Sequence, residues 1–316
     1  MKKLLLLCFL LFPCLSGCAD YNELNMQSLV RYAGVDFSDG EITVTILPVG
    51  EERSYLSRGE SFFEAVREMS GRLDKKLWWG HTESIVFGEE ALSEAFDGTV
   101  DAILRARDVY LDVVPISAKN LTAEEVINEA GALSVFANEG NSRRFKGVPL
   151  WKLLREREMY GVCVIPTVEK RDGDVVLTGG AVISENGFAG YLSETEFLFR
   201  SLLTDKTAGG YLPVIQLDSS REVSFEILGN NLRVRKGEEK VLIEQEITLS
   251  PAEVRGEVSN SELEEAAWKF LENGYEKLIS DAKARGLGNI FMIKEKKLLP
   301  ETEVRFSVKI SNVLGG

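Results

Sequence analysis

Apolar and polar positions along the chain follow two different periods. In several short runs every second residue is apolar, and these runs are bounded by Gly, Pro, Asn or Asp, a pattern typical of half-buried strands. The expected strands cover 28–37, 41–49, 84–87, 109–117, 161–170, 175–184, 188–192, 222–234, 240–249 and 304–313. Asp39-Gly40 and Asp172-Gly173 each separate two such runs. The dipeptide Asp-Gly favours tight turns, so both positions are predicted to be hairpins.

Other segments repeat their apolar residues with the period of a helix. The expected helices cover 61–73, 89–106, most of 122–154 around a polar loop at 138–141, 193–203 and 261–285. In the longest of them Ser261 and Glu264 have the spacing of a capping box, and Gly286 is a stop signal. Strands come in pairs and helices interleave irregularly. The predicted fold class is therefore α+β, with several mixed α/β domains and mainly antiparallel sheets.

The length of 316 residues favours more than one domain, because a single core rarely grows beyond roughly 250–300 residues. The polar, glycine-bearing stretch 204–210 is the preferred boundary. We expect an N-terminal α+β region at 18–205, divisible at about 117/118, and a C-terminal α+β domain at 206–316 that contains the long helix.

The first 18 residues have the features of a bacterial lipoprotein signal. Lys2 and Lys3 are followed by an apolar run at 4–12, which is too short to span a bilayer. Leu15-Ser16-Gly17-Cys18 then has the form of a lipobox, an aliphatic residue and two small ones before cysteine. We expect residues 1–17 to be removed and Cys18 to carry the lipid, so that acyl chains hold the protein on a membrane.

The remaining sequence predicts no transmembrane domain after signal cleavage, since no stretch between Ala19 and Gly316 approaches a spanning length. Cys8 and Cys14 leave with the signal, and Cys163 lies in an apolar run. With Cys18 lipidated, the mature chain can form no intramolecular disulfide and no cysteine-based zinc cluster. Cys163 is expected to be a small buried residue.

Charge and motif content argue against several functions. The formal net charge of -13 disfavours nucleic-acid binding and docking on anionic lipid by charge alone. His81 is the only histidine, no Gly-x-Ser-x-Gly motif occurs, and the 50 acidic residues single out no catalytic pair. We therefore expect no enzymatic activity, no metal and no cofactor. For His81 a structural or packing role is favoured, since it precedes a strand and follows two tryptophans.

Several segments, in this order, resemble the Ger(x)C spore germination lipoproteins, the C subunits of nutrient germinant receptors. The clearest is Trp78-Trp79-Gly80-His81, which leads into an apolar strand and Gly88-Glu89-Glu90. Further similar segments are 15–18, 20–25, 34–36, 59–65, 104–108, 179–182 and 190–192. The chain departs from the family at Ala19, where Trp is usual, and in the shorter, less aromatic segment 286–300.

The resemblance implies a non-enzymatic, lipid-anchored receptor subunit with three mixed α/β domains. It would lie on the outer face of the spore inner membrane, beside integral-membrane A and B subunits, and help trigger germination. Trp78, Trp79 and His81 are candidate interface residues; because neighbours on a strand face opposite sides, one tryptophan is expected in the core and the other at the surface. A solute-binding lipoprotein of a transporter is the alternative, and a carboxylate-dependent surface hydrolase a more distant one.

Overall fold

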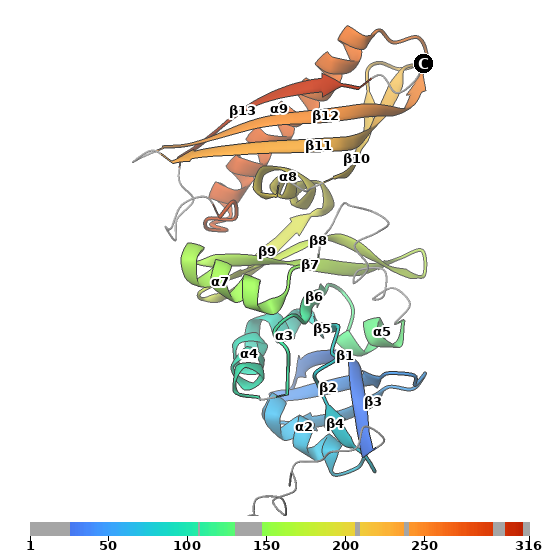
Figure 1. The fold of residues 1–316 in the computed structure, drawn as a ribbon, viewed down its shortest axis with the longest axis vertical. Coiled ribbons are helices and arrows are strands. Elements are labelled where there is room, and N and C mark those ends of the chain that lie inside the picture. Colours follow the sequence, from blue (N-terminus) through green and yellow to red (C-terminus); the bar gives the residue numbers. More distant parts are fainter. Residues whose placement is uncertain are drawn as a thin grey trace, which may run out of the picture.

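A computed structural model describes residues 26–106, 108–129, 147–205, 209–236, 240–292 and 301–311. Cys18, the signal segment 1–17 and the predicted loop 138–141 lie outside these residues. The described chain forms an elongated body with a nine-stranded sheet towards one end and a four-stranded sheet at the other (Figure 1). Among the described helices none is both long and apolar enough to cross a membrane.

The nine-stranded sheet has the order β3-β2-β1-β5-β6-β7-β8-β9, and β4 pairs with β1 beside this path. Its strands are β1 Gln27–Ser38, β2 Glu41–Pro48, β3 Tyr55–Gly59, β4 Lys76–Trp78, β5 Ser84–Phe87, β6 Val114–Ala118, β7 Val162–Arg171, β8 Asp174–Ser184 and β9 Gly187–Ser193. The outer strands pair antiparallel, whereas β1, β5, β6 and β7 are parallel neighbours. The sheet is therefore mixed, with a parallel centre.

Helices cover both faces of this sheet. They are α2 Phe62–Ser70, α3 Glu89–Glu94, α4 Phe96–Arg105, α5 Ala123–Asn128 and α7 Leu150–Tyr160. The larger core lies between the sheet and α2, α3, α4 and α7, and a smaller core lies under α5. The helix expected at 89–106 is two helices, because the backbone at Ala95 leaves helical geometry (φ -121°, ψ -14°). The strand expected at 109–117 begins only at Val114, since Val113 closes a turn onto Tyr110.

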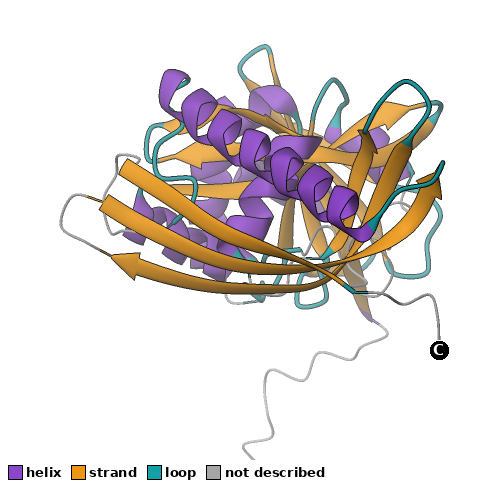
Figure 2. Cartoon of the chain, turned by 90° about the horizontal axis from the view of Figure 1, so that it is seen from above, coloured by secondary structure: helices purple, strands orange, loops and turns teal. Residues whose placement is uncertain are grey.

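The four-stranded sheet has the order β10-β11-β12-β13, with β13 parallel to β12. Its elements are β10 Gly210–Gln216, β11 Glu222–Lys236, β12 Lys240–Arg255, β13 Glu301–Ile310 and the helices α8 Glu194–Thr204 and α9 Asn260–Ala284. Figure 2 shows α9 lying across one side of this sheet, and no described helix lies on its other side. The long helix is present as predicted, but its capping box is formed by Ser259 and Glu262 and not by Ser261 and Glu264.

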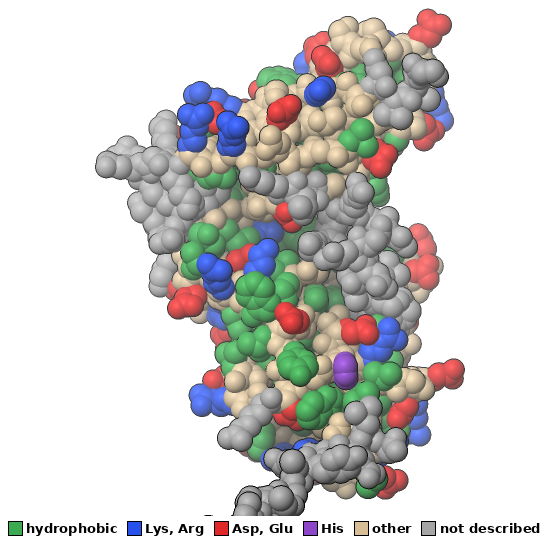
Figure 3. Space-filling view, viewed as in Figure 1, with side chains coloured by type: hydrophobic (Ala, Val, Ile, Leu, Met, Phe, Trp, Pro, Cys, Tyr) green, Lys and Arg blue, Asp and Glu red, His purple; other side chains and the backbone are tan. Residues whose placement is uncertain are grey.

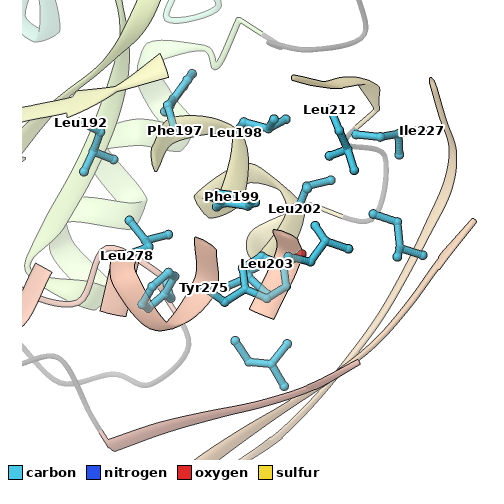
Figure 4. Packing of buried hydrophobic residues seen from close by; sticks show 14 of the residues in the cluster. Leu192, Phe197, Leu198, Phe199, Leu202, Leu203, Leu212, Ile227, Tyr275 and Leu278 are labelled. Carbon is cyan, nitrogen blue, oxygen red and sulfur yellow. The ribbon is translucent and has the colours of Figure 1, made fainter. Parts of the chain in front are cut away.

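The C-terminal core joins helices from both sides of the predicted domain boundary. Phe199, Leu202 and Leu203 of α8 pack against Tyr275 and Leu278 of α9 (Figure 4). The rings of Phe199 and Tyr275 meet edge to face at 5.4 Å. Helix α8 thus lies before the expected boundary in the sequence, but its side chains belong to the core of the C-terminal domain. The division at 205/206 stays a prediction.

A buried arginine fastens α8 to the segment that follows α9. Arg200 is 7% exposed, and its Nε donates to the carbonyl oxygen of Ile290 at 2.9 Å. Burial lowers the pKa of Arg200 to about 10, with the carboxylate of Glu156 acting in the opposite direction. The segment after the long helix is therefore held in place by a contact to α8.

Candidate functional site: an aromatic surface at one edge of the sheet

β1, β4, β5 and β6 run parallel, with β4 and β5 following one another along β1, so their amino-terminal ends all point towards one edge of the nine-stranded sheet, which we term the amino edge. Two loops enter the sheet here, 79–83 before β5 and 108–113 before β6. The amide of Val114 donates to the carbonyl oxygen of Glu83 at 3.0 Å, so the loops lie side by side. Side chains far apart in the sequence therefore share one surface.

The two tryptophans that open this region point to different environments, as predicted. Trp79 is 7% exposed and packs edge to face against Phe62 at 5.9 Å. Trp78 is half-buried, and its indole lies over Gly80, where an added Cβ would come within 2.7 Å of Nε1. The glycine in the Trp-Trp-Gly-His segment is thus required by the position of the Trp78 ring.

His81 is exposed, which contradicts a packing role, whereas a structural role for it stays a prediction. The turn that carries it is held by its neighbour: the amide of Thr82 donates to the carbonyl oxygen of Trp79 at 3.1 Å, and the Thr82 hydroxyl donates to that of Val30 at 3.2 Å. Both bonds hold Thr82 inward, and His81 is left at the surface. Whether His81, Trp78 and Trp79 contact a partner stays a prediction.

Two further aromatic residues join this surface that sequence analysis missed. Tyr110 is 64% and Trp151 45% exposed. The amide of Trp151 donates to the carbonyl oxygen of Leu111 at 3.1 Å, and its indole Nε1 donates to Asp112 Oδ1 at 3.0 Å, so α7 begins against the loop before β6. Figure 3 shows hydrophobic side chains gathered around the single histidine on this face. We term Trp78, His81, Tyr110 and Trp151 the aromatic surface.

The family-like residues Gly34, Asp36 and Gly88 serve to seat helix α5. A Cβ at Gly34 would come within 2.7 Å of Ile127 Cδ1, so glycine lets α5 approach β1. The Asp36 carboxylate accepts from the amides of Ala123 at 2.7 Å and Glu124 at 3.2 Å. Gly88 lies against the same carboxylate and has no room for a side chain. These residues have structural roles and form no reactive site.

Asp36→Ala is expected to lower the free energy of unfolding by about 1–2 kcal/mol, because two partly buried helix amides lose their acceptor. Burial raises the pKa of Asp36 above its usual value, although the two amide bonds oppose this. The folded protein therefore holds the proton to higher pH than the unfolded chain, and this site's contribution declines as the pH rises through the raised pKa. Wild type should gain stability relative to Asp36→Asn on acidification towards pH 4, as measured by urea unfolding. A constant difference would contradict the assignment.

The remaining reactive groups near the sheet are held in unreactive states. Burial raises the pKa of the Cys163 thiol to about 12, so it is no nucleophile at neutral pH. Burial likewise raises the pKa of Tyr32 to about 12, and its hydroxyl donates to Glu83 Oε2 at 3.1 Å. Glu83 also accepts from Arg31 Nε at 3.0 Å. Arg31 and Tyr32 of β1 thus hold Glu83, the last residue of the 79–83 loop, in place.

Two hollows on the described surface have few polar groups that converge on one point. One of about 570 Å³ lies where α8 meets β11, and one of about 360 Å³ lies between β3 and α2. The first is lined by Leu203, Thr204, Leu232, Arg233, Val234 and Arg235. The second is lined by Leu56, Ser57, Arg58, Glu64, Glu68 and Arg72. Within the described ranges, no group of three or more His, Cys, Asp or Glu side chains could hold a metal ion.

Comparison with known proteins points to spore germination. Residues 20–170 match the family described as the spore germination protein N-terminal domain. The crystal structure of the GerBC protein has the same fold, with a TM-score of 0.53 and 17% identity over 93% of this chain and 100% of that one. No curated protein matches the sequence. The domain match carries the assignment, and the shared fold extends over nearly all of the chain. Over residues 20–170 the chain belongs to the family of spore germination N-terminal domains, and a Ger(x)C protein is the identity that this domain and the GerBC-like fold support.

Proposed function

We propose that this chain is the lipid-anchored C subunit of a nutrient germinant receptor, which acts with integral-membrane A and B subunits to trigger spore germination. It would lie on the outer face of the spore inner membrane, attached through Cys18. Its part is that of a binding and assembly subunit, without an enzymatic activity of its own.

The observation that carries this proposal is the match of residues 20–170 to the germination family, directly after the lipobox at 15–18. A lipobox alone would suit many exported proteins, and the domain alone would not say how the protein is held. Together they support a germination domain that begins two residues after a lipidation signal. The body then needs no membrane-crossing helix to be retained on a bilayer.

The surface chemistry supports an assembly role over catalysis or solute capture. Exposed aromatic side chains at the amino edge are suited to contact with a partner protein or with a membrane. The single cysteine of the described chain is buried, and the single histidine is exposed on this aromatic surface. A solute-binding protein would instead need a cleft between two lobes with converging polar groups.

Affinity capture from spore membranes in mild detergent tests this function. The full-length protein with a C-terminal tag is expected to bring down two integral-membrane proteins encoded with germinant receptors. A tagged, unrelated spore lipoprotein provides the control for capture through lipid alone. Recovery of a transporter permease and its ATPase in place of receptor subunits would contradict the proposal and favour the solute-binding alternative.

A further inference from the structure

We propose that the aromatic surface rests on the lipid headgroup and acyl boundary of the bilayer, so that the amino edge of the nine-stranded sheet faces the membrane. This inference deepens the proposed function and relies on its lipid anchor at Cys18. Phospholipid is then the partner of Trp78, His81, Tyr110 and Trp151. This contact fixes how the whole body is oriented relative to the membrane.

Strand direction brings the anchored chain to the same edge as the aromatic surface. β1 runs parallel to β4 and β5, and its first residues pair with the start of β4, Gln27 opposite Lys76 and Leu29 opposite Trp78. The chain that comes from Cys18 therefore enters the sheet beside Trp78. Met26 is eight residues beyond Cys18, and eight residues span at most about 26–29 Å. The amino edge cannot move farther than this from the lipid.

The exposed residues at this edge are suited to a membrane interface. Tyrosine and tryptophan combine a large apolar ring with one polar atom and gather where apolar and wet regions meet. The polar atom of Trp151 is already bonded to Asp112, which leaves the ring free to contact lipid. Met26 and Val49, 62% and 50% exposed, extend the apolar character to the start of β1, where the amide of Val49 donates to the carbonyl oxygen of Leu29 at 2.8 Å.

Charge gives no comparable attraction at this edge. The exposed Lys75, Lys76 and Lys152 are largely offset by the exposed Asp74, which precedes Lys75, and by the exposed Asp112, which is bonded to Trp151 beside Lys152. The contact is therefore predicted to be apolar in origin, with little dependence on anionic lipid or salt. A weak apolar preference is sufficient, because a short tether keeps the surface at a high effective concentration near the bilayer.

The orientation has a consequence for the rest of the molecule. The four-stranded sheet lies at the opposite end of the elongated body (Figure 1). With the amino edge against lipid, this sheet and the side of it that no described helix covers are held away from the bilayer, where they remain accessible to other proteins.

Quenching of tryptophan fluorescence by brominated lipid tests the orientation. The lipidated full-length protein is placed in vesicles of phosphatidylcholine with and without bromine on the acyl chains. The protein has four tryptophans: Trp79 is buried, Trp268 lies on α9 of the C-terminal half, and only Trp78 and Trp151 belong to the aromatic surface. Trp151→Phe is therefore expected to reduce quenching by about half.

Trp268→Phe is the matched control, because Trp268 is also partly exposed, at 39%, but lies far from the amino edge. It should leave the quenching unchanged, and vesicles with phosphatidylglycerol should give the same result as neutral ones. Protein that floats with vesicles but shows no quenching, or equal losses in the two variants, would overturn the orientation while the anchor stands. Protein that fails to float would overturn the anchor and this inference together. Quenching that disappears once A and B subunits are reconstituted would assign the surface to a protein partner instead.

Discussion

Replacing Cys18 by alanine is expected to move the protein from the membrane fraction of spores to the supernatant and to reduce germination with nutrients severely. The lipid attaches through the cysteine sulfur, which alanine lacks. Each buried methylene of an acyl chain contributes about 0.8 kcal/mol, so losing the chains removes most of the membrane affinity. The aromatic surface would remain, but without the tether a small apolar contact gives only weak binding. Fractionation with immunodetection measures retention, and release of dipicolinic acid measures germination.

Cys163→Ala is the matched control for this experiment. It also removes a cysteine, but Cys163 is buried in β7 and distant in sequence from the lipobox. This variant should keep its place in the membrane fraction, with a modest loss of stability from the small cavity. Mass spectrometry of the native protein should show a diacylglyceryl group on residue 18. Wild-type fractionation and full germination of Cys18→Ala would reject the anchored receptor subunit.

Features set by neighbouring residues could be predicted from the sequence. The hairpins at Asp39-Gly40 and Asp172-Gly173 form where expected, and both aspartates adopt the positive φ of 54° that this turn requires. The long helix needs only its own periodicity and caps, and it was located to within one residue at each end. Its capping box was misplaced, because Ser259 and Ser261 are followed at the same spacing by Glu262 and Glu264 and the sequence alone does not choose between them.

Features set by distant residues were mostly missed. β3, β4 and β10 are short or edge strands whose own pattern is weak, and they form because a longer strand provides a partner. The parallel centre of the large sheet depends on the order in which β1, β5, β6 and β7 assemble, which alternation within one strand does not show.

The aromatic surface could be predicted only in part for the same reason. Trp78 and His81 were singled out through the family resemblance, whereas Tyr110 and Trp151 were not. Tyr110 was assigned to the strand expected at 109–117, but it lies in the loop before β6. Trp151 joins it only because residues 111–113 bond to the first turn of α7. That contact links segments about 40 residues apart. In the sequence, the only indication of an exposed aromatic residue here is that Trp151 directly follows Leu150, since neighbouring residues of a helix do not share one face.

Gly274→Val is expected to be among the most destabilising single substitutions in the C-terminal half. Gly274 lies within α9, where glycine is unfavourable for a helix by about 1 kcal/mol relative to alanine, so a local reason for its presence is lacking. The ring of Phe199 from α8 explains it, because the ring occupies the space that a Cβ would take. Valine would force the two helices apart or drive Phe199 from its position against Tyr275, with a loss of about 3 kcal/mol or more in the free energy of unfolding.

Chemical denaturation of Gly274→Val, Phe199→Ala and the double variant separates this steric conflict from a general intolerance of α9. Phe199→Ala alone should cost about 3–5 kcal/mol through the cavity it opens. In the double variant the valine enters that cavity, so the combined loss should fall short of the sum by about 1–3 kcal/mol. Asn273→Ala, at the exposed neighbouring position, is the control and should change stability by less than about 0.5 kcal/mol. Strict additivity of the two single losses would show that α8 and α9 do not cross at Gly274, and the packing that joins α8 to the four-stranded sheet would have to be reassigned.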